Sequence, residues 1–257
     1  MRIVSMVPSW TETLIACGAN VVGRTRFCIH PKESVKPIAV VGGTKNIDWE
    51  KLKNLNPDLL LLDKEENPRS MSDESPVPVL ATHVTGISVV ADEIEKIAQT
   101  ISDDTVGRAL RGVADSWRNV QSKRNVLKTW SDFPGVFEWT QEPDLPPSEA
   151  KFVYVIWKDP WMAVAPGTFI ASVLETCGIP SEALWPGPES QAQTKYPVFD
   201  PKDLPEETVY LFSTEPYPFH KKKAGLENFG RGALILDGEC FSWFGVRSLQ
   251  FLKKVLF

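Results

Sequence analysis

The sequence predicts an α/β protein made of two parallel-sheet lobes joined by one long helix. Short β-rich runs alternate with helical segments through the first hundred residues, which is the pattern of a parallel sheet covered by helices. A similar alternation returns after residue 150, beyond a long amphipathic segment. We therefore expect an N-terminal lobe over residues 1–102, a bridging helix over 103–124 and a C-terminal lobe over 125–257.

The elements of the first lobe are marked by turn and capping residues. A strand is expected from Arg2, and Ser9 and Glu12 have the spacing of a capping box, which predicts a helix starting at Ser9. The run 59–62 is wholly apolar, as expected for a strand that is covered on both faces. Further strands are expected at 21–25 and 77–81, and helices at 48–55 and 86–101.

The predicted bridging helix carries one apolar stripe. Its members recur at spacings of three and four residues, and they are Val106, Ala109, Leu110, Val113, Ala114, Trp117 and Val120. Gly107 and Gly112 each disfavour a helix by up to about 1 kcal/mol, so packing must stabilise it. We expect one continuous helix that contacts both lobes.

The second lobe follows an unusual connection. Residues 125–150 contain four prolines and several aromatic residues, and we expect an irregular insertion packed on this lobe. Strands are then expected at 152–157, 209–213 and 233–236, with helices at 169–177 and 246–256.

The composition narrows the class of protein. The chain has 257 residues, 24% of them charged, and a formal net charge of -5, which gives no sign of a nucleic-acid-binding surface. No apolar run approaches the roughly twenty residues of a membrane span. Because a β-rich run begins at Arg2, no signal peptide is expected. We therefore expect a cytoplasmic protein. The alternative is a periplasmic or extracytoplasmic protein whose leader has been removed. The scattered cysteines are expected to be free thiols.

Aromatic residues gather where the predicted strands end, and this is where parallel sheets bind ligands. The rings expected to line one cleft are Trp10, Phe27, Trp157, Trp161, Trp185, Tyr196 and Trp243. Such a cleft suits a large, flat, partly apolar ligand. The alternative is that these rings close the ends of a core. Binding is expected to be mainly apolar and little affected by salt, with Ser9, Lys158 and Glu215 orienting the ligand and Glu65 as a further contact.

Catalytic motifs are scarce. No phosphate-binding loop, dinucleotide fingerprint or nucleophile elbow is present, and the three histidines are far apart, so neither a protein-built metal site nor a bound cofactor is expected. Cys28 and His30 could form a nucleophile with its base or a ligand pair, and Glu65 with Glu66 an acid/base pair. Structural roles are the more common outcome for such pairs. We expect a binding protein, with an enzyme or a sensor that reuses the same fold as alternatives.

Several stretches share the order and spacing of a known family. They are Arg2–Glu12, Phe27–Pro31, Val41–Gly43 with Asn46 and Glu50, Asn56–Leu59, Val155–Met162, Tyr196 with Pro197, and Trp243–Gly245. The chain resembles the helical-backbone (class III) substrate-binding proteins of ABC importers, and it is most similar to the branch that binds cobalamin and iron chelates. The resemblance implies two Rossmann-like lobes, one long connecting helix and a ligand cleft between the lobes. The implied ligand is a corrinoid, haem or an iron-siderophore, and the implied partner is an ABC permease.

The sequence departs from this family in two respects. Family members that serve importers carry a leader, which is not seen here. They also carry an exposed glutamate on each lobe that docks on the permease, whereas this chain has Arg69 near the first position and Lys202 with Asp203 near the second. Glu65 or Glu66 is the substitute available on the first lobe. These departures weigh against transport more than against ligand binding.

Overall fold

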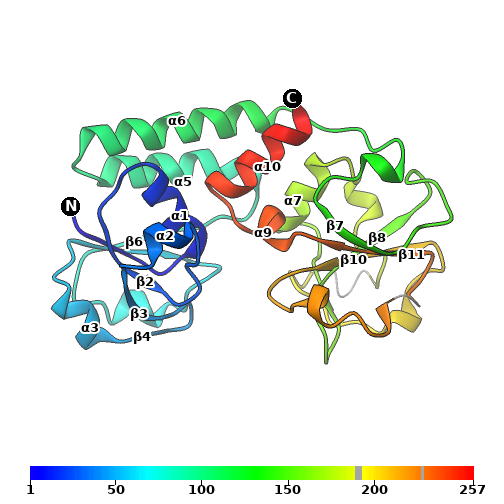
Figure 1. Ribbon diagram of the computed structural model, residues 1–257, viewed down its shortest axis with the longest axis horizontal. Helices are drawn as coiled ribbons and strands as arrows, with labels where there is room; N and C mark the ends of the chain where they lie inside the picture. The colour runs from blue at the N-terminus through cyan, green and yellow to red at the C-terminus, as the bar shows by residue number, and fades with distance from the viewer. Residues whose placement is uncertain (189–192, 227–228) are drawn as a thin grey trace. The chain divides into compact units, whose positions relative to one another are not determined.

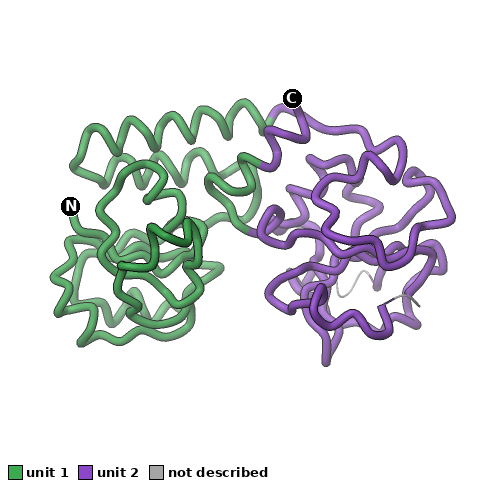
Figure 2. Tube along the Cα trace, in the orientation of Figure 1, with its two compact units in different colours: residues 1–121, 243–250 green, residues 122–242, 251–257 purple. Residues whose placement is uncertain are grey.

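The computed structural model describes residues 1–188, 193–226 and 229–257 (Figure 1). In this part of the chain two compact units are present: unit 1 comprises residues 1–121 and 243–250, and unit 2 comprises residues 122–242 and 251–257 (Figure 2). Both units contain a sheet and helices, so the predicted α/β class is confirmed. The return of residues 243–250 to unit 1 was not expected from the sequence. None of the described helices is long and apolar enough to cross a membrane.

Unit 1 is built on a largely parallel sheet with the strand order β4-β3-β2-β1-β5-β6, in which only the pairing of β3 with β4 is antiparallel. Its elements are β1 (Ile3–Ser5), α1 (Pro8–Ala16), β2 (Val21–Thr25), α2 (Lys32–Val35), β3 (Ala39–Gly43), β4 (Asn46–Ile47), α3 (Trp49–Asn54), β5 (Leu59–Asp63), α4 (Ser70–Asp73), β6 (Val79–Thr82), α5 (Ile87–Thr100) and α6 (Asp104–Gln121). Every residue of β5 is buried, as its apolar sequence predicts.

The start of α1 corrects one prediction. The helix begins at Pro8 rather than at Ser9, and Val7 occupies the capping position without a side-chain hydrogen bond. Proline fits the first turn of a helix because the amide hydrogen that it lacks would have no partner there. The predicted capping box is therefore absent, and the Glu12 carboxylate instead accepts hydrogen bonds from Arg247.

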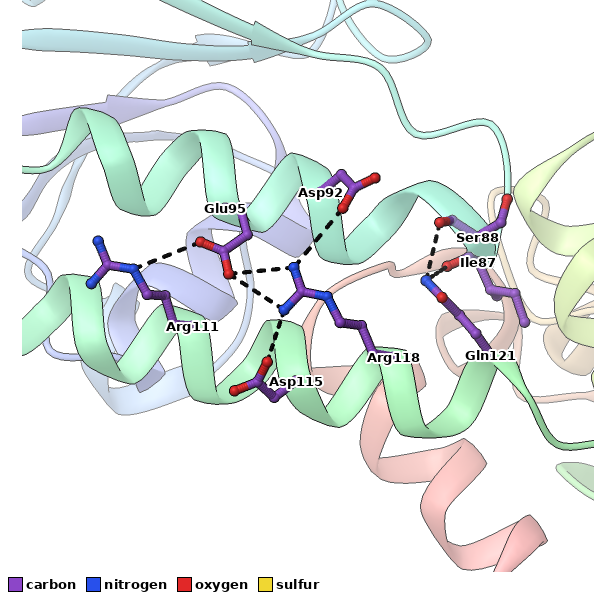
Figure 3. Close-up of polar contacts among 8 residues, drawn as sticks. All are labelled: Ile87, Ser88, Asp92, Glu95, Arg111, Asp115, Arg118 and Gln121. Atoms are coloured by element: carbon purple, nitrogen blue, oxygen red, sulfur yellow. Dashed lines mark hydrogen bonds and ion pairs between the residues drawn. The ribbon is translucent and has the colours of Figure 1, made fainter.

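The long helix α6 is continuous and packs beside α5 (Figure 1). Polar contacts join the two helices along their exposed side (Figure 3): Arg118 lies 3.4 Å from Glu95, and the Gln121 amide donates to the carbonyls of Ile87 and Ser88, each at 3.0 Å. The exposed ion pair contributes little stability by itself, about 0–1 kcal/mol. The apolar stripe of α6 must therefore supply most of the attachment.

That stripe is buried at most of the predicted positions. Trp117 is fully buried, and its indole Nε1 donates to the Gly245 carbonyl at 3.1 Å, so α6 also holds the returning segment 243–250. Ala109 is exposed, in contrast to the prediction. Gly112 is exposed too, while Gly107 is buried against α5, where an added Cβ would lie 3.4 Å from the Ala98 carbonyl oxygen. Contact of α6 with both lobes stays a prediction.

Unit 2 is built on a second sheet, with the strand order β7-β11-β10-β8-β9. Its central strands β8, β10 and β11 are parallel, and the edge strands β7 and β9 are antiparallel to their neighbours. The elements of its first half are η1 (Trp130–Asp132), β7 (Val136–Gln141), β8 (Lys151–Trp157), β9 (Met162–Ala163), α7 (Phe169–Thr176) and η2 (Ser181–Ala183). They are followed by η3 (Pro201–Asp203), β10 (Thr208–Ser213), η4 (Phe219–Lys221), β11 (Gly232–Leu236) and α9 (Gly238–Ser242). Helix α10 (Val246–Leu256) begins in unit 1 and ends in unit 2.

Residues 125–150 are more regular than predicted. They contain the strand β7, which pairs with β11 and extends the sheet of unit 2. The segment Val136–Gln141 contains two β-branched and two aromatic residues, which suits a strand at a sheet edge. The prolines at 134, 143, 146 and 147 lie outside it, so they bound the strand rather than prevent it.

Candidate functional site

The parallel strands of unit 1 place several predicted residues at one sheet edge. Helix α1 follows β1, Phe27 follows β2, Glu65 follows β5, and His83 follows β6. Because β1, β2, β5 and β6 are parallel neighbours, their carboxyl ends share this edge.

Trp10 belongs to the core of unit 1. Its side chain is fully buried, its indole Nε1 donates to Thr82 Oγ1 at 2.8 Å, and its ring meets Phe244 edge-on at 4.9 Å. Ser9 beside it is 5% exposed. In this structure Trp10 fits the alternative of a ring that closes the end of a core, because it presents no surface to a ligand.

A buried carboxylate that the sequence analysis missed organises the same edge. Asp63 is fully buried and accepts hydrogen bonds from Thr82 Oγ1 at 2.6 Å and from the backbone amides of Glu65 and Val84 at 2.9 and 3.1 Å. Burial raises its pKa, and these three hydrogen bonds oppose the rise. Its position directly after four leucines was the available signal.

Asp63 thereby fixes a polar loop. Glu65 Oε1 lies 2.8 Å from His83 Nε2, and Asn67 donates to the carbonyls of Met6 and Thr44. Burial raises the pKa of Glu66, the nearby Asp63 adds to this, and the Lys45 ammonium opposes it. This edge of unit 1 therefore carries acidic groups held in fixed positions.

Phe27 offers an accessible ring at this edge, since it is 47% exposed with the Arg26 guanidinium 4.8 Å from its centroid. Cys28 beside it is buried, and its sulfur lies 3.1 Å from the hydroxyls of both Thr11 and Thr25. Burial raises the pKa of this thiol, so the thiolate is disfavoured. These surroundings suit a structural cysteine better than a nucleophile.

Trp243 lies in unit 1 and packs among charged and aromatic groups. Its ring is 5.4 Å from that of His30 and 5.3 Å from the Arg247 guanidinium, and it is 8% exposed. Arg247 forms two hydrogen bonds with the Glu12 carboxylate, at 2.9 and 2.7 Å. This paired geometry fixes Arg247 and, through it, the indole.

The corresponding edge of unit 2 is richer in accessible rings. Trp157, at the end of β8, is 41% exposed, and its ring lies 5.5 Å from that of Tyr217. Trp161 is half-buried against Phe219, with Lys158 Nζ 5.3 Å from its centroid. Trp157 and Trp161 are thus brought to one region, and sequence reasoning missed Tyr217 as their neighbour.

The remaining predicted residues of unit 2 differ in accessibility. Trp185 is 6% exposed and packs in the core against Phe199, so it too presents little surface. Tyr196 is 38% exposed. Glu215 is half-buried and accepts a hydrogen bond from the Ser242 hydroxyl. Across the described residues, no group of three or more histidine, cysteine, aspartate or glutamate side chains is arranged to hold a metal ion.

Two α/β units with accessible rings at the carboxyl ends of parallel strands suit a ligand-binding protein. The family model described as periplasmic binding protein matches residues 3–135, more than half of the chain, and the chain belongs to this family. The predicted resemblance is thereby confirmed, and so, at the level of the family, is the prediction of a binding protein rather than an enzyme.

The similar curated proteins cover only part of the chain. The vitamin B12-binding protein of Yersinia pestis (strain Pestoides F) is 30% identical over 103 residues, which are 38% of this chain and 36% of that protein. The vitamin B12-binding protein of Yersinia pseudotuberculosis serotype O:1b (strain IP 31758) matches equally. The match therefore spans about a third of the length of these relatives.

Similar solved structures cover nearly the whole chain. The periplasmic vitamin B12 binding protein BtuF of Vibrio cholerae has a TM-score of 0.65 at 17% identity, over 99% of this chain and 94% of that one. A periplasmic heme binding protein from Pseudomonas aeruginosa has a TM-score of 0.69 at 17% identity, over 99% and 90%. The heme-binding protein RhuT from Roseiflexus sp. RS-1 has a TM-score of 0.67 at 18% identity, over 99% and 95%. At these identities the likeness shows the fold alone, and it confirms the predicted fold class.

Proposed function

We propose that this protein binds a flat metal chelate, a corrinoid, haem or an iron-siderophore complex, and that it is not an enzyme. The observation that carries the proposal is a pair of rings at the carboxyl edge of unit 2: Trp157, which is 41% exposed, and Tyr217, which lies half-buried beside it. Membership of the periplasmic binding protein family supports it. The buried Cys28 thiol, with its raised pKa, gives no support to covalent catalysis.

The chemistry of the rings suits such ligands. An indole ring has a large apolar face and few rotatable bonds, so a flat ligand gains contact area while little side-chain entropy is lost. The chelate would bring its own metal, so the protein would supply contact area and polar groups rather than a full set of metal ligands. Phe27 offers a further accessible ring on unit 1. A cleft between the lobes stays a prediction.

Titration of the purified protein tests the proposal directly. Cyanocobalamin, ferric haem and ferric siderophore complexes are added in turn, and tryptophan fluorescence and ligand absorption are recorded. Trp157→Ala should weaken binding by about 1–3 kcal/mol, the range for burying one large apolar side chain, and should leave the unfolding transition unchanged because the ring is 41% exposed.

Trp139 provides a matched control. It is a tryptophan of similar exposure, 37%, but it lies on β7 at the far edge of the same sheet from β8 and β9. Trp139→Ala should leave the affinity unchanged. Equal losses in the two variants, or no binding of any of these chelates, would contradict the proposed function.

Permease docking is a separate part of the proposal. We propose that this chain does not dock on a permease through the paired glutamates that its resemblance implies. Near the first expected position Arg69 is exposed and lies 3.5 Å from Asp73, and Lys202 and Asp203 are exposed near the second. The test is co-purification with an ABC permease from the same cells. This part of the proposal would be contradicted if the wild-type protein co-purified with the permease and the Glu65→Ala variant did not.

The cellular location also stays a prediction. A cytoplasmic protein was the expectation, and the similar structures named above are of periplasmic proteins. Fractionation of cells that express the native gene distinguishes the two, and recovery outside the cytoplasm would contradict the cytoplasmic expectation.

A further inference from the structure

Four aromatic rings of unit 2 form one connected cluster, which runs from the exposed Trp157 to the buried Phe219. The Trp157 ring lies 5.5 Å from Tyr217, Tyr217 lies 4.5 Å from Phe219, and Phe219 stacks on Trp161 at 6.1 Å with an interplanar angle of 7°. We call these four residues the aromatic platform. Its inner members, Phe219 and Trp161, pack on the core of unit 2, while Trp157 at its outer end is 41% exposed.

Two lysine ammonium groups are placed over this platform. Lys222 Nζ lies 4.7 Å from the Tyr217 centroid, and Lys158 Nζ lies 5.3 Å from the Trp161 centroid. Among the residues that the structure describes, no carboxylate forms an ion pair with either lysine, and this includes Asp159, the next residue after Lys158. Lys223, by contrast, is paired with Glu138.

This arrangement favours an anionic group on the ligand. A ring face attracts an ammonium group by about 0.5–1 kcal/mol at an exposed site, but it provides no lone pair directed at the three N–H donors. Each lysine is therefore held near the ring with hydrogen-bonding capacity to spare. A ligand that stacks on Trp157 and carries an acid group could accept those bonds with little further ordering of the lysine.

We propose that the aromatic platform binds a planar ligand that carries carboxylate groups, and that Lys158 and Lys222 are the residues that recognise those carboxylates. This rests on the proposed function and narrows it to chelates with acidic substituents, in preference to a corrinoid without free carboxylates. It also replaces the expectation that ligand affinity depends little on salt, because salt screens the ion pairs that exposed lysines form with carboxylates.

The test compares two probes that differ only in their acid groups. Ferric mesoporphyrin has two carboxylates, and its dimethyl ester has the same ring and metal without them; cyanocobalamin serves as the corrinoid. The full-length protein should bind the diacid about ten-fold more tightly than the diester. Raising the salt concentration should weaken binding of the diacid and leave binding of the diester unchanged.

Lysine variants assign the effect to residues. Lys158→Met and Lys222→Met remove the charge and keep an unbranched apolar side chain, and each should weaken diacid binding about three-fold without affecting the diester. Lys221→Met is the matched control, because Lys221 is an exposed neighbour that is not placed over a ring; it should change neither affinity.

The possible results separate this inference from the proposed function. Equal affinities for diacid and diester, or lysine variants that bind the diacid as well as the wild type does, would overturn the inference. Tight binding of cyanocobalamin that is unaffected by the lysine variants would also overturn it and would leave the proposed function intact. Failure of all probes to bind would overturn both.

Discussion

Trp117 links the long helix α6 to the returning segment 243–250, and its replacement should measurably destabilise unit 1. The indole is fully buried and donates to the Gly245 carbonyl at 3.1 Å. Trp117→Ala removes the ring and leaves a cavity, which typically costs about 3–5 kcal/mol. Because domains are stable by only about 5–15 kcal/mol, this is a substantial part of the total.

Trp117→Phe separates the hydrogen bond from the packing. Phenylalanine keeps an apolar ring but cannot donate, so the Gly245 carbonyl loses the indole hydrogen bond and keeps only the one from the Leu249 amide at 3.3 Å. The loss of one such hydrogen bond costs about 0.5–1.5 kcal/mol. Urea unfolding followed by far-ultraviolet circular dichroism measures both variants without relying on tryptophan emission. Both tryptophan variants should shift the unfolding transition of unit 1 to lower urea concentration. The control is Arg108→Ala on the exposed face of α6, whose free energy of unfolding should stay within about 0.5 kcal/mol of the wild type. A loss below about 1 kcal/mol for Trp117→Ala would refute the reasoning.

Three further predictions concern α6, the thiols and the buried carboxylate. Gly112→Ala should stabilise the protein by about 0.5–1 kcal/mol, because an added Cβ meets nothing within 4 Å. Gly107→Ala should stabilise it less, because the added Cβ would contact α5. Urea unfolding of both variants checks this. Burial raises the pKa of Cys28 and raises that of Cys17 to about 11, so both should react with a thiol reagent at about pH 8 far more slowly than after unfolding. Because the folded pKa of Asp63 is raised, its titration contributes stability that is present below its unfolded pKa and is lost as pH rises through its folded pKa. In urea unfolding, the stability of the wild type relative to Asp63→Asn should therefore fall as the pH rises above about 4; a constant difference would argue against this.

Local sequence patterns were sufficient for most of the fold. The four leucines before Asp63 identify a strand covered on both faces, and the stripe through Trp117 identifies α6, because both patterns follow from the periodicity of one element. The strand β7 was missed because the four prolines nearby indicated an irregular segment, although β7 itself contains β-branched and aromatic residues. The course of the chain after Ser242 could not be read locally, since the return of residues 243–250 to unit 1 depends on contacts such as that of Gly245 with Trp117, which lies 128 positions away.

The candidate site was only partly predictable for a related reason. In the sequence, Trp10 and Trp157 have equivalent positions, because each lies near the carboxyl end of a strand. Their accessibility is decided by distant partners: Thr82 accepts the Trp10 indole hydrogen and Phe244 packs on its ring, while the Trp157 ring is met by Tyr217 and stays 41% exposed. Buried rings of this kind contribute to stability, and accessible ones are free to contact a ligand.

This distinction changes how the site should be mutated. A variant of Trp10 would lose both its hydrogen bond to Thr82 and its packing, so a weaker affinity in that variant could arise from damage to the fold alone. A variant of Trp157 or Lys222 removes groups at the surface, where stability changes are small, and a change in affinity then reports contact with the ligand. The chemistry of the ligand is therefore best read from the aromatic platform, whose two lysines allow stacking and charge to be varied separately.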